Sequence, residues 1–208
     1  DDVRIALAGR SPDKLLAVRE SLGEKAQSWS IIAADASQPS TLNAMAARTQ
    51  VVVTTVGPYA RYGLPLVAAC AAAGTDYADL TGETLFIRDS IEQYHKQAAD
   101  TGARIVHSCG FDSVPSDLTV LALYRRARED QAGALTDTNL VVRAMSGGLS
   151  GGTIASGIDV FSTVSRDAEA RRAMNDPYTL TPDRAGEPEL GGQPDIRWRR
   201  GSDVAEAL

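Results

Sequence analysis

Residues 3–11, with the sequence VRIALAGRS, decide the fold class of this 208-residue chain. Residues 3–8 form a short apolar stretch that is typical of a buried strand. Gly9, Arg10 and Ser11 follow, and Pro12 can begin a helix with Ser11 as its N-cap. A strand that turns through glycine directly into a helix is characteristic of nucleotide-binding βαβ units. Residues 3–8 are therefore predicted to be a strand of such a unit.

Arg10 indicates which strand of the unit this is. In a dinucleotide-binding fold, the residue that ends the second strand faces the adenosine ribose; an acidic residue there selects NAD, and arginine accommodates the 2′-phosphate of NADP. We therefore predict that Arg10 and the hydroxyl of Ser11 bind NADP(H). The first strand and its glycine-rich phosphate loop are then expected before Asp1, and this chain alone is expected to bind NADPH weakly and to lack reductase activity.

Four more Val- and Ile-containing segments follow, at residues 30–34, 51–56, 76–80 and 104–108. Each gap between them holds a segment with a helical pattern. Strands that alternate with helices indicate an α/β fold with a parallel sheet covered by helices on both faces. We therefore predict a Rossmann-like, doubly wound parallel sheet that lacks its first strand.

The predicted helices have recognisable ends. Pro65 is expected near the start of an Ala-rich helix that ends at Gly74, and Gly102 is expected to end the next helix. Pro115 begins another predicted helix, which runs to about residue 129. The small side chains at residues 67–73 are expected in the core, because they allow a helix to pack closely on a sheet.

The pattern changes after Gly133. Residues 138–145 are predicted to form a strand of a different sheet, and residues 153–173 a helix. Prolines and glycines from residue 175 onward indicate a loop. We therefore predict two domains: an NADP-binding domain at residues 1–132, and the beginning of an α+β substrate or dimerisation domain at residues 133–208, with a Pro/Gly-rich loop at residues 175–208.

The composition excludes several classes of function. A net charge of −6 argues against a nucleic-acid partner. The chain contains no apolar run near the roughly 20 residues that a membrane helix requires. Two cysteines without metal-site spacing and only two histidines predict no metal site, and they are consistent with a reducing cytoplasm.

Polar loops that contain glycine follow three of the predicted strands. Ligands of open parallel sheets bind beyond the carboxyl ends of the strands, so these loops are predicted to form one binding crevice. Asp35, which ends another strand, either accepts a hydrogen bond from the adenine amino group or only caps the next helix. The loop residues predicted to bind the cofactor are Thr55, Val56, Gly57, Pro58, Tyr59, Asp79, Cys109, Gly110, Phe111 and Asp112.

These motifs together resemble the saccharopine dehydrogenase-like oxidoreductases. The resemblance rests on residues 9–11, 57–70, 74–83 and 109–117, and the segment at 148–153 is similar to the family's entry into its substrate domain. Within the family, the chain is most similar to the trans-acting enoyl reductase branch, which serves the assembly of polyketide-derived, phthiocerol-type lipids.

The resemblance implies an NADPH-dependent reductase. Hydride would go to the β-carbon of an α,β-unsaturated thioester, and a proton would follow at the α-carbon. Tyr59 and Asp112 are the candidate proton donors. Implied partners are an acyl thioester or another small molecule, a polyketide synthase carrier domain and a second copy of the chain, at a cytoplasmic location or peripheral to a membrane.

Rival functions are weaker. Residues 148–152 match the G-x-S-x-G elbow of serine hydrolases, but no histidine follows His107 to complete the triad in that fold's order. His107 is expected to be anchored in the sheet and thus unable to serve Cys109 as a base, and Cys109 is predicted to be a buried thiol. The Tyr-x-x-x-Lys pair of short-chain dehydrogenases is absent. A reductase of another substrate and a non-catalytic NADP-binding sensor remain alternatives.

Overall fold

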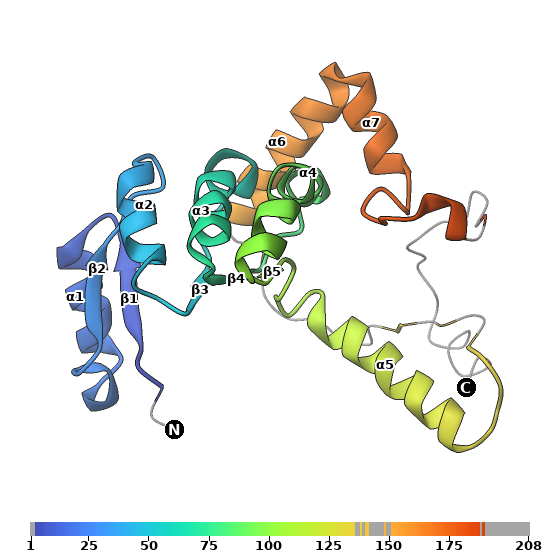
Figure 1. Cartoon of the computed structure of the whole chain (residues 1–208), viewed down its shortest axis with the longest axis horizontal. Coiled ribbons are helices and arrows are strands. Elements are labelled where there is room, and N and C mark those ends of the chain that lie inside the picture. The colour runs from blue at the N-terminus through green and yellow to red at the C-terminus, as the bar shows by residue number, and fades with distance from the viewer. Residues whose placement is uncertain are drawn as a thin grey trace.

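The computed structural model describes residues 3–135, 138, 140–141, 148, 151–187 and 189 (Figure 1). Strands and helices alternate along most of the chain, as predicted from the sequence. The elements in order are β1 (Ala6–Gly9), α1 (Pro12–Ser21), η1 (Glu24–Ala26), β2 (Ser30–Ala33), α2 (Pro39–Ala46), β3 (Val51–Thr54), α3 (Tyr59–Ala73), β4 (Asp76–Asp79), α4 (Thr84–Thr101), β5 (Ile105–Val106), α5 (Val114–Glu129), α6 (Gly151–Arg166), α7 (Ala168–Asn175) and η2 (Arg184–Gly186).

The strands form two parallel sheets, whereas the sequence predicted one. β1 pairs with β2 in one sheet, and the other sheet has the order β3-β4-β5. Within the described residues, no strand lies between β1 and β3 to join them. The two groups nonetheless follow the order of a doubly wound sheet, 3-2-1-4-5-6, with the strand between them left out. The α/β Rossmann-type class is therefore confirmed, although its sheet is divided.

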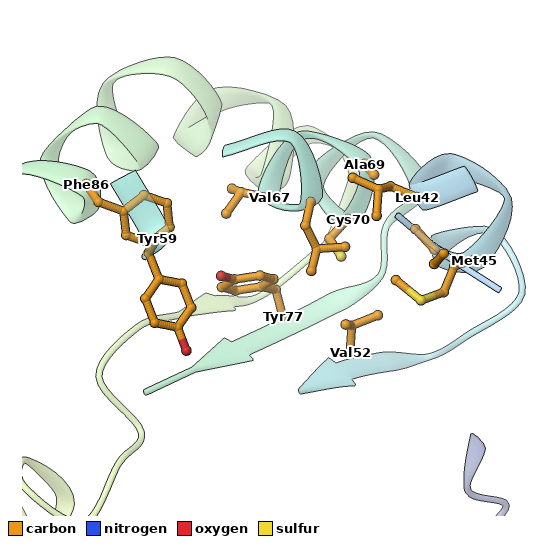
Figure 2. Close-up of a cluster of buried hydrophobic side chains, with 12 residues drawn as sticks. Leu42, Met45, Val52, Tyr59, Val67, Ala69, Cys70, Tyr77 and Phe86 are labelled. Carbon is orange, nitrogen blue, oxygen red and sulfur yellow. The ribbon is translucent and has the colours of Figure 1, made fainter. Parts of the chain in front are cut away.

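Within the described residues, only one face of the β3-β4-β5 sheet is covered by helices. Val52 of β3 is buried in the core against α3 (Figure 2), and Thr54, two residues later on the same side of the strand, is also buried. Val51 and Val53, which alternate with them, are 53% and 74% exposed. Alternate residues of a strand point to opposite faces of its sheet. The face that carries Val51 and Val53 therefore lacks a covering layer within the described residues.

The core lies between α2, α3 and the covered face of this sheet (Figure 2). Val67 and Cys70 of α3 point toward Val52 and Tyr77 of the strands. The predicted core placement of residues 67–73 is confirmed as far as Ala71, since Val67, Ala69, Cys70 and Ala71 are buried, but Ala72 and Ala73 at the end of α3 are exposed. Burial raises the pKa of the Cys70 thiol to about 12, so this thiol stays protonated and inert at neutral pH.

Helix α3 begins six residues earlier than predicted. Pro58 is its N-cap residue and Tyr59 its first residue, so Pro65 lies inside the helix. Proline at this position removes one backbone donor, and the helix is maintained by its extensive packing on the core. The predicted ends of α3 and α4 are confirmed: Gly74 and Gly102 have φ of +70° and +83°, the left-handed conformation in which glycine commonly terminates helices.

Gly63 lets α3 and α4 approach closely, and this contact gives a stability prediction. A Cβ atom at Gly63 would lie 2.4 Å from Cε2 of the buried Phe86 ring. We expect Gly63→Ala to lower the free energy of unfolding by about 1–3 kcal/mol through overpacking, despite the better helix propensity of alanine. Urea unfolding monitored by circular dichroism measures the change.

Gly157→Ala is the matched control, because a Cβ atom at Gly157 of α6 would have no atom within 4 Å. We expect this substitution to leave stability unchanged or to raise it by up to about 1 kcal/mol. Equal effects of the two substitutions would show that the contact with Phe86 is not a tight one.

The chain after α5 differs from the prediction in one described element. The predicted helix over residues 153–173 is broken into α6 and α7 at Asp167. The Asp167 carboxylate accepts hydrogen bonds from the backbone N–H groups of Glu169 and Ala170, at 2.8 and 3.2 Å, and so caps a new helix. Helices α6 and α7 lie beside α3 and α4, where Arg61 pairs with Asp159 and Arg88 with Glu169.

Other predictions for this half of the chain lie largely outside the described residues. In the predicted strand at 138–145, only residues 138, 140 and 141 are described, and none of these three is in a strand. The predicted Pro/Gly-rich loop at 175–208 is described only to residue 187 and at 189, and it contains η2. Among the described helices, none is long and apolar enough to cross a membrane.

Candidate functional site

The predicted cofactor residues follow the carboxyl ends of the strands. Since the strands within each sheet are parallel, their following loops emerge at the same edge of that sheet. One group of predicted residues therefore follows β1 and β2, and a second group follows β3, β4 and β5.

Arg10 and Asp35 lie together at the end of the β1-β2 sheet. Arg10 directly follows β1, is exposed, and precedes Ser11, the N-cap residue of α1. Asp35 follows β2, and its carboxylate accepts hydrogen bonds from the N–H and hydroxyl of Ser37, at 2.9 and 2.7 Å. These bonds, with a smaller contribution from the Arg10 charge, lower the pKa of Asp35. The sequence left open that Asp35 caps the next helix, but the N-cap residue of α2 is Gln38, and Asp35 instead forms a turn with Ser37 beside an exposed cation.

The loop after β3 presents its backbone to solvent. Thr55, Val56 and Gly57 are exposed, and the Gly57-Pro58 peptide is cis. The three atoms nearest to a Cβ atom at Gly57 would all belong to Tyr59, at ordinary van der Waals distances of 3.6–3.9 Å. The space around Gly57 is therefore open to a ligand.

Tyr59, at the end of this loop, is buried. Its hydroxyl donates to the carbonyl oxygen of Thr54, at 3.1 Å, and accepts from the N–H of Leu80, at 3.4 Å. Burial raises the pKa of the phenol. The hydroxyl thus connects the loop after β3 to the loop after β4, and it is engaged with the backbone of both.

Asp79 is the centre of a buried network that joins β4 to the loop after β5. Its side chain is fully buried, and its carboxylate accepts four hydrogen bonds: from the backbone N–H groups of Thr81 and Ser108, from the Tyr77 hydroxyl and from His107 Nδ1, at 2.7–3.1 Å. Burial opposes ionisation, but these hydrogen bonds outweigh it and lower the pKa of Asp79. The carboxylate therefore holds the loops after β4 and β5 together from within the core and does not face solvent.

His107 continues the network to α4. Its Nδ1 contacts Asp79 and its Nε2 lies 2.9 Å from the Ser90 hydroxyl. The prediction that His107 is anchored is confirmed. Contacts that run from Asp79 through His107 to Ser90 have the arrangement of a hydrolase triad, but Ser90 is only 3% exposed, whereas a catalytic serine presents its hydroxyl to substrate. The chain of contacts ties β4, β5 and α4 together.

The loop after β5 is the most exposed of the predicted segments. Phe111 is 89% exposed, and Asp112 is also exposed. A Cβ atom at Gly110 would lie 2.6 Å from Asp112 Oδ1, a contact that rotation of the Asp112 side chain would relieve, and 3.1 Å from Leu80 Cβ, so glycine helps this loop to pack closely against the loop after β4. Cys109 was predicted to be buried, and the prediction is wrong: β5 ends at Val106, three residues earlier, and Cys109 lies in the exposed loop.

Glu83 has a role that the sequence did not predict. Its buried carboxylate accepts hydrogen bonds from the backbone N–H groups of Tyr59 and Ala60, at 2.9 and 2.8 Å, and from the Ser156 hydroxyl of α6, at 2.6 Å. The segment around Glu83 had been noted only as a polar loop. Nothing in its spacing from Tyr59 or Ser156 indicates the contacts, because they form only after folding.

The hydrolase elbow lies mostly beyond what the structure describes. Ser150, its nucleophile position, is outside the described residues, and Thr153 is exposed in the first turn of α6. Most of the cofactor candidates are exposed or half-buried in the loops after β1, β2, β3 and β5. Two of them, Tyr59 and Asp79, are buried and hold the loops in place.

Comparisons with known proteins identify the family of this chain. The model of the saccharopine dehydrogenase NADP-binding domain matches residues 1–106. A protein of Mycobacterium tuberculosis H37Rv that is provisionally named a trans-acting enoyl reductase is 72% identical over 207 residues, which cover 100% of this chain and 49% of that protein. The trans-acting enoyl reductase of Mycobacterium ulcerans is 64% identical over 208 residues, covering 100% of this chain and 50% of that protein.

The chain therefore spans about half the length of the curated relatives it matches. Among solved structures, apo saccharopine dehydrogenase (L-Glu forming) from Saccharomyces cerevisiae superposes with a TM-score of 0.51 at 16% identity, over 62% of this chain and 26% of that one. This likeness supports the fold. The family resemblance predicted from the sequence is confirmed: the chain belongs to the saccharopine dehydrogenase NADP-binding domain family, and its cofactor is NADP(H).

Proposed function

We propose that this chain provides the NADP-binding part of a reductase that acts on the double bond of an α,β-unsaturated acyl thioester. The observation that carries the proposal is the 64% identity, over the whole chain, to a protein named a trans-acting enoyl reductase. The loops after β1, β3 and β5 support it, because they offer an exposed cation and exposed glycine backbone at strand ends, where this fold binds dinucleotides.

The exposed residues fit the parts of NADP(H). Arg10 and Ser11 suit the 2′-phosphate. Asp35, which is near enough to Arg10 to feel its charge, suits the adenosine. The backbone of Thr55, Val56, Gly57 and Pro58 and the loop of Cys109, Gly110, Phe111 and Asp112 suit the remainder of the cofactor. When bound, NADPH supplies the hydride, and the chain binds and orients it and keeps water away.

Of the two candidate proton donors, Asp112 is better placed. Its carboxylate is exposed in the loop after β5, whereas the Tyr59 hydroxyl already donates to the Thr54 carbonyl. We propose Asp112 as the first residue to test for proton delivery and Tyr59 as a residue that positions the loops. Asp79 supports the same loops through its four hydrogen bonds.

The partners follow from the same proposal. An acyl thioester substrate carried by a polyketide synthase domain fits a trans-acting reductase in polyketide-derived lipid assembly, in the cytoplasm or at a membrane surface. The exposed Val51 and Val53 are compatible with a second copy of the chain. The two predicted domains, at residues 1–132 and 133–208, are proposed to bind the cofactor and the substrate respectively.

The test is cofactor oxidation by the full-length protein. We expect saturable NADPH binding by calorimetry, preference for NADPH over NADH, and NADPH oxidation with an enoyl thioester from a panel that also includes imine substrates. NADPH oxidation with imine substrates alone would show that the protein is a reductase of another substrate. NADPH binding without oxidation of any substrate would favour the non-catalytic sensor.

A further inference from the structure

Helix α3 begins with backbone donors that its own sequence does not cap. Its N-cap residue is Pro58, which has no side-chain hydrogen-bonding group. The N–H groups of Arg61 and Tyr62 both donate to the Pro58 carbonyl oxygen, at 3.2 Å. The N–H groups of Tyr59 and Ala60, the first two residues of the helix, have no carbonyl acceptor within the helix and need one from elsewhere.

Glu83 supplies that acceptor from a different loop. One carboxylate oxygen, Oε1, accepts from Tyr59 N–H and the other, Oε2, from Ala60 N–H. A carboxylate at a helix N-terminus is also favoured by the helix dipole. Because these donors directly follow Gly57 and Pro58, the Glu83 carboxylate fixes the end of the loop that is proposed to approach the cofactor.

The same carboxylate is held from the other side by α6. The Ser156 hydroxyl donates to Oε1 at 2.6 Å. Asp159, one turn later on α6, accepts from Arg61 Nε at 2.6 Å and from a second guanidinium nitrogen of the same residue. Helix α6 thus contacts the first turn of α3 at two points, one of them through Glu83.

We propose that Glu83 is a positioning residue that couples the placement of α6 to the geometry of the Gly57-Pro58-Tyr59 loop. The proposal rests on the proposed function of that loop in binding NADP(H). Glu83 is 4% exposed, so its charge depends on the three hydrogen bonds for compensation. If α6 moves away, the carboxylate loses the Ser156 bond and the orientation in which it serves both N–H groups. Packing of α6 against α3 therefore favours the loop conformation that is proposed to bind NADP(H).

The first experiment measures the loop without cofactor. In the full-length protein, we expect Ser156→Ala to speed amide hydrogen exchange at Tyr59 and Ala60 about tenfold, because a hydrogen bond to a charged group is lost. Ser156→Thr retains the hydroxyl and is expected to restore slow exchange. Unchanged exchange in Ser156→Ala would overturn the coupling, whether or not the protein binds NADPH.

The second experiment measures NADPH affinity in the same variants. We expect Ser156→Ala to raise the NADPH dissociation constant about tenfold, and Glu83→Gln to raise it at least as much, since an amide NH₂ would then face a backbone N–H. Ser156→Ala is expected to add nothing in the Glu83→Gln background, because Ser156 acts through Glu83. Additive effects of the two substitutions would contradict the proposal.

Glu169→Gln is the matched control. It removes the other described side-chain ion pair between these helices and the NADP-binding half, the 3.0 Å contact of Glu169 with Arg88, which does not touch the loop. We expect unchanged NADPH affinity and unchanged exchange at Tyr59. An equal loss in Glu169→Gln would show a general effect of the docked helices and overturn the specific role of Glu83. Absence of NADPH binding by the unaltered protein would instead refute the proposed function. The hydrogen-exchange experiment would still test the coupling between α6 and the loop, because it needs no cofactor.

Discussion

Asp79→Ala is expected to lower the free energy of unfolding by about 3–5 kcal/mol, the largest stability effect predicted for this chain. The substitution removes the acceptor of four hydrogen bonds and leaves buried donors from Tyr77, Thr81, His107 and Ser108 without a partner. Urea unfolding monitored by circular dichroism and near-ultraviolet absorbance measures the loss.

Asp76→Ala is the control on the same strand. Asp76 pairs with Arg104, whose side chain is 77% exposed, and such surface ion pairs contribute about 0–1 kcal/mol. We expect a loss of at most about 1–2 kcal/mol, which includes the hydrogen bond that Asp76 accepts from the backbone N–H of Arg104. If the two aspartates proved equally important, the network around Asp79 would not be a main source of stability.

The lowered pKa of Asp79 also gives the direction of a pH effect. The unfolded chain binds the proton of this carboxyl more tightly than the folded chain, so protonation favours unfolding. The stabilisation is complete above the unfolded pKa of about 4 and is lost as the pH falls through the lower folded value. The stability of Asp79→Ala is therefore expected to depend less steeply on pH in this acidic range than that of the unaltered protein.

The fold was predictable where local chemistry determined it. Gly74 and Gly102 end their helices as expected, since each adopts a left-handed conformation that other residues disfavour. The apolar pattern failed at Asp167. It predicted one helix across this residue, whereas the Asp167 carboxylate caps a new helix, α7. The edges of β1 and β3 that are unpaired within the described residues agree with the prediction of a sheet that lacks its first strand, but the division into two separate sheets emerges only from the assembled fold.

The candidate site shows the same contrast. Sequence position placed Arg10, Gly57 and Gly110 at strand ends, and the structure has all three in loops that follow β1, β3 and β5. Position could not distinguish the exposed residues from Tyr59 and Asp79, whose side chains turn inward. Glu83 went unnoticed because its donors are about 24 and 73 residues away, contacts that only the assembled fold creates.

Arg10→Asp is expected to reverse the cofactor preference of the full-length protein. Arg10 is exposed at the end of β1, where a cation can form charge-assisted hydrogen bonds with the 2′-phosphate of NADPH. Each such bond contributes about 1.5–3 kcal/mol, so its loss weakens NADPH binding by roughly 10- to 150-fold, before repulsion by the new carboxylate is added. NADH lacks the phosphate, and an acidic residue at this position can bind its ribose hydroxyl. Calorimetric titration with both cofactors measures the two affinities.

Arg4→Asp makes the same change of charge two residues before β1 begins at Ala6, at the opposite end of the strand from Arg10, and Arg4 is also exposed. We expect it to alter NADPH affinity by less than about threefold, since only long-range, salt-screened electrostatics would act there. Higher salt is expected to reduce the effect of Arg4→Asp further and to leave most of the effect of Arg10→Asp, because direct contacts are screened less. A protein that still prefers NADPH after Arg10→Asp would exclude Arg10 from the cofactor site and leave the 2′-phosphate to another cation.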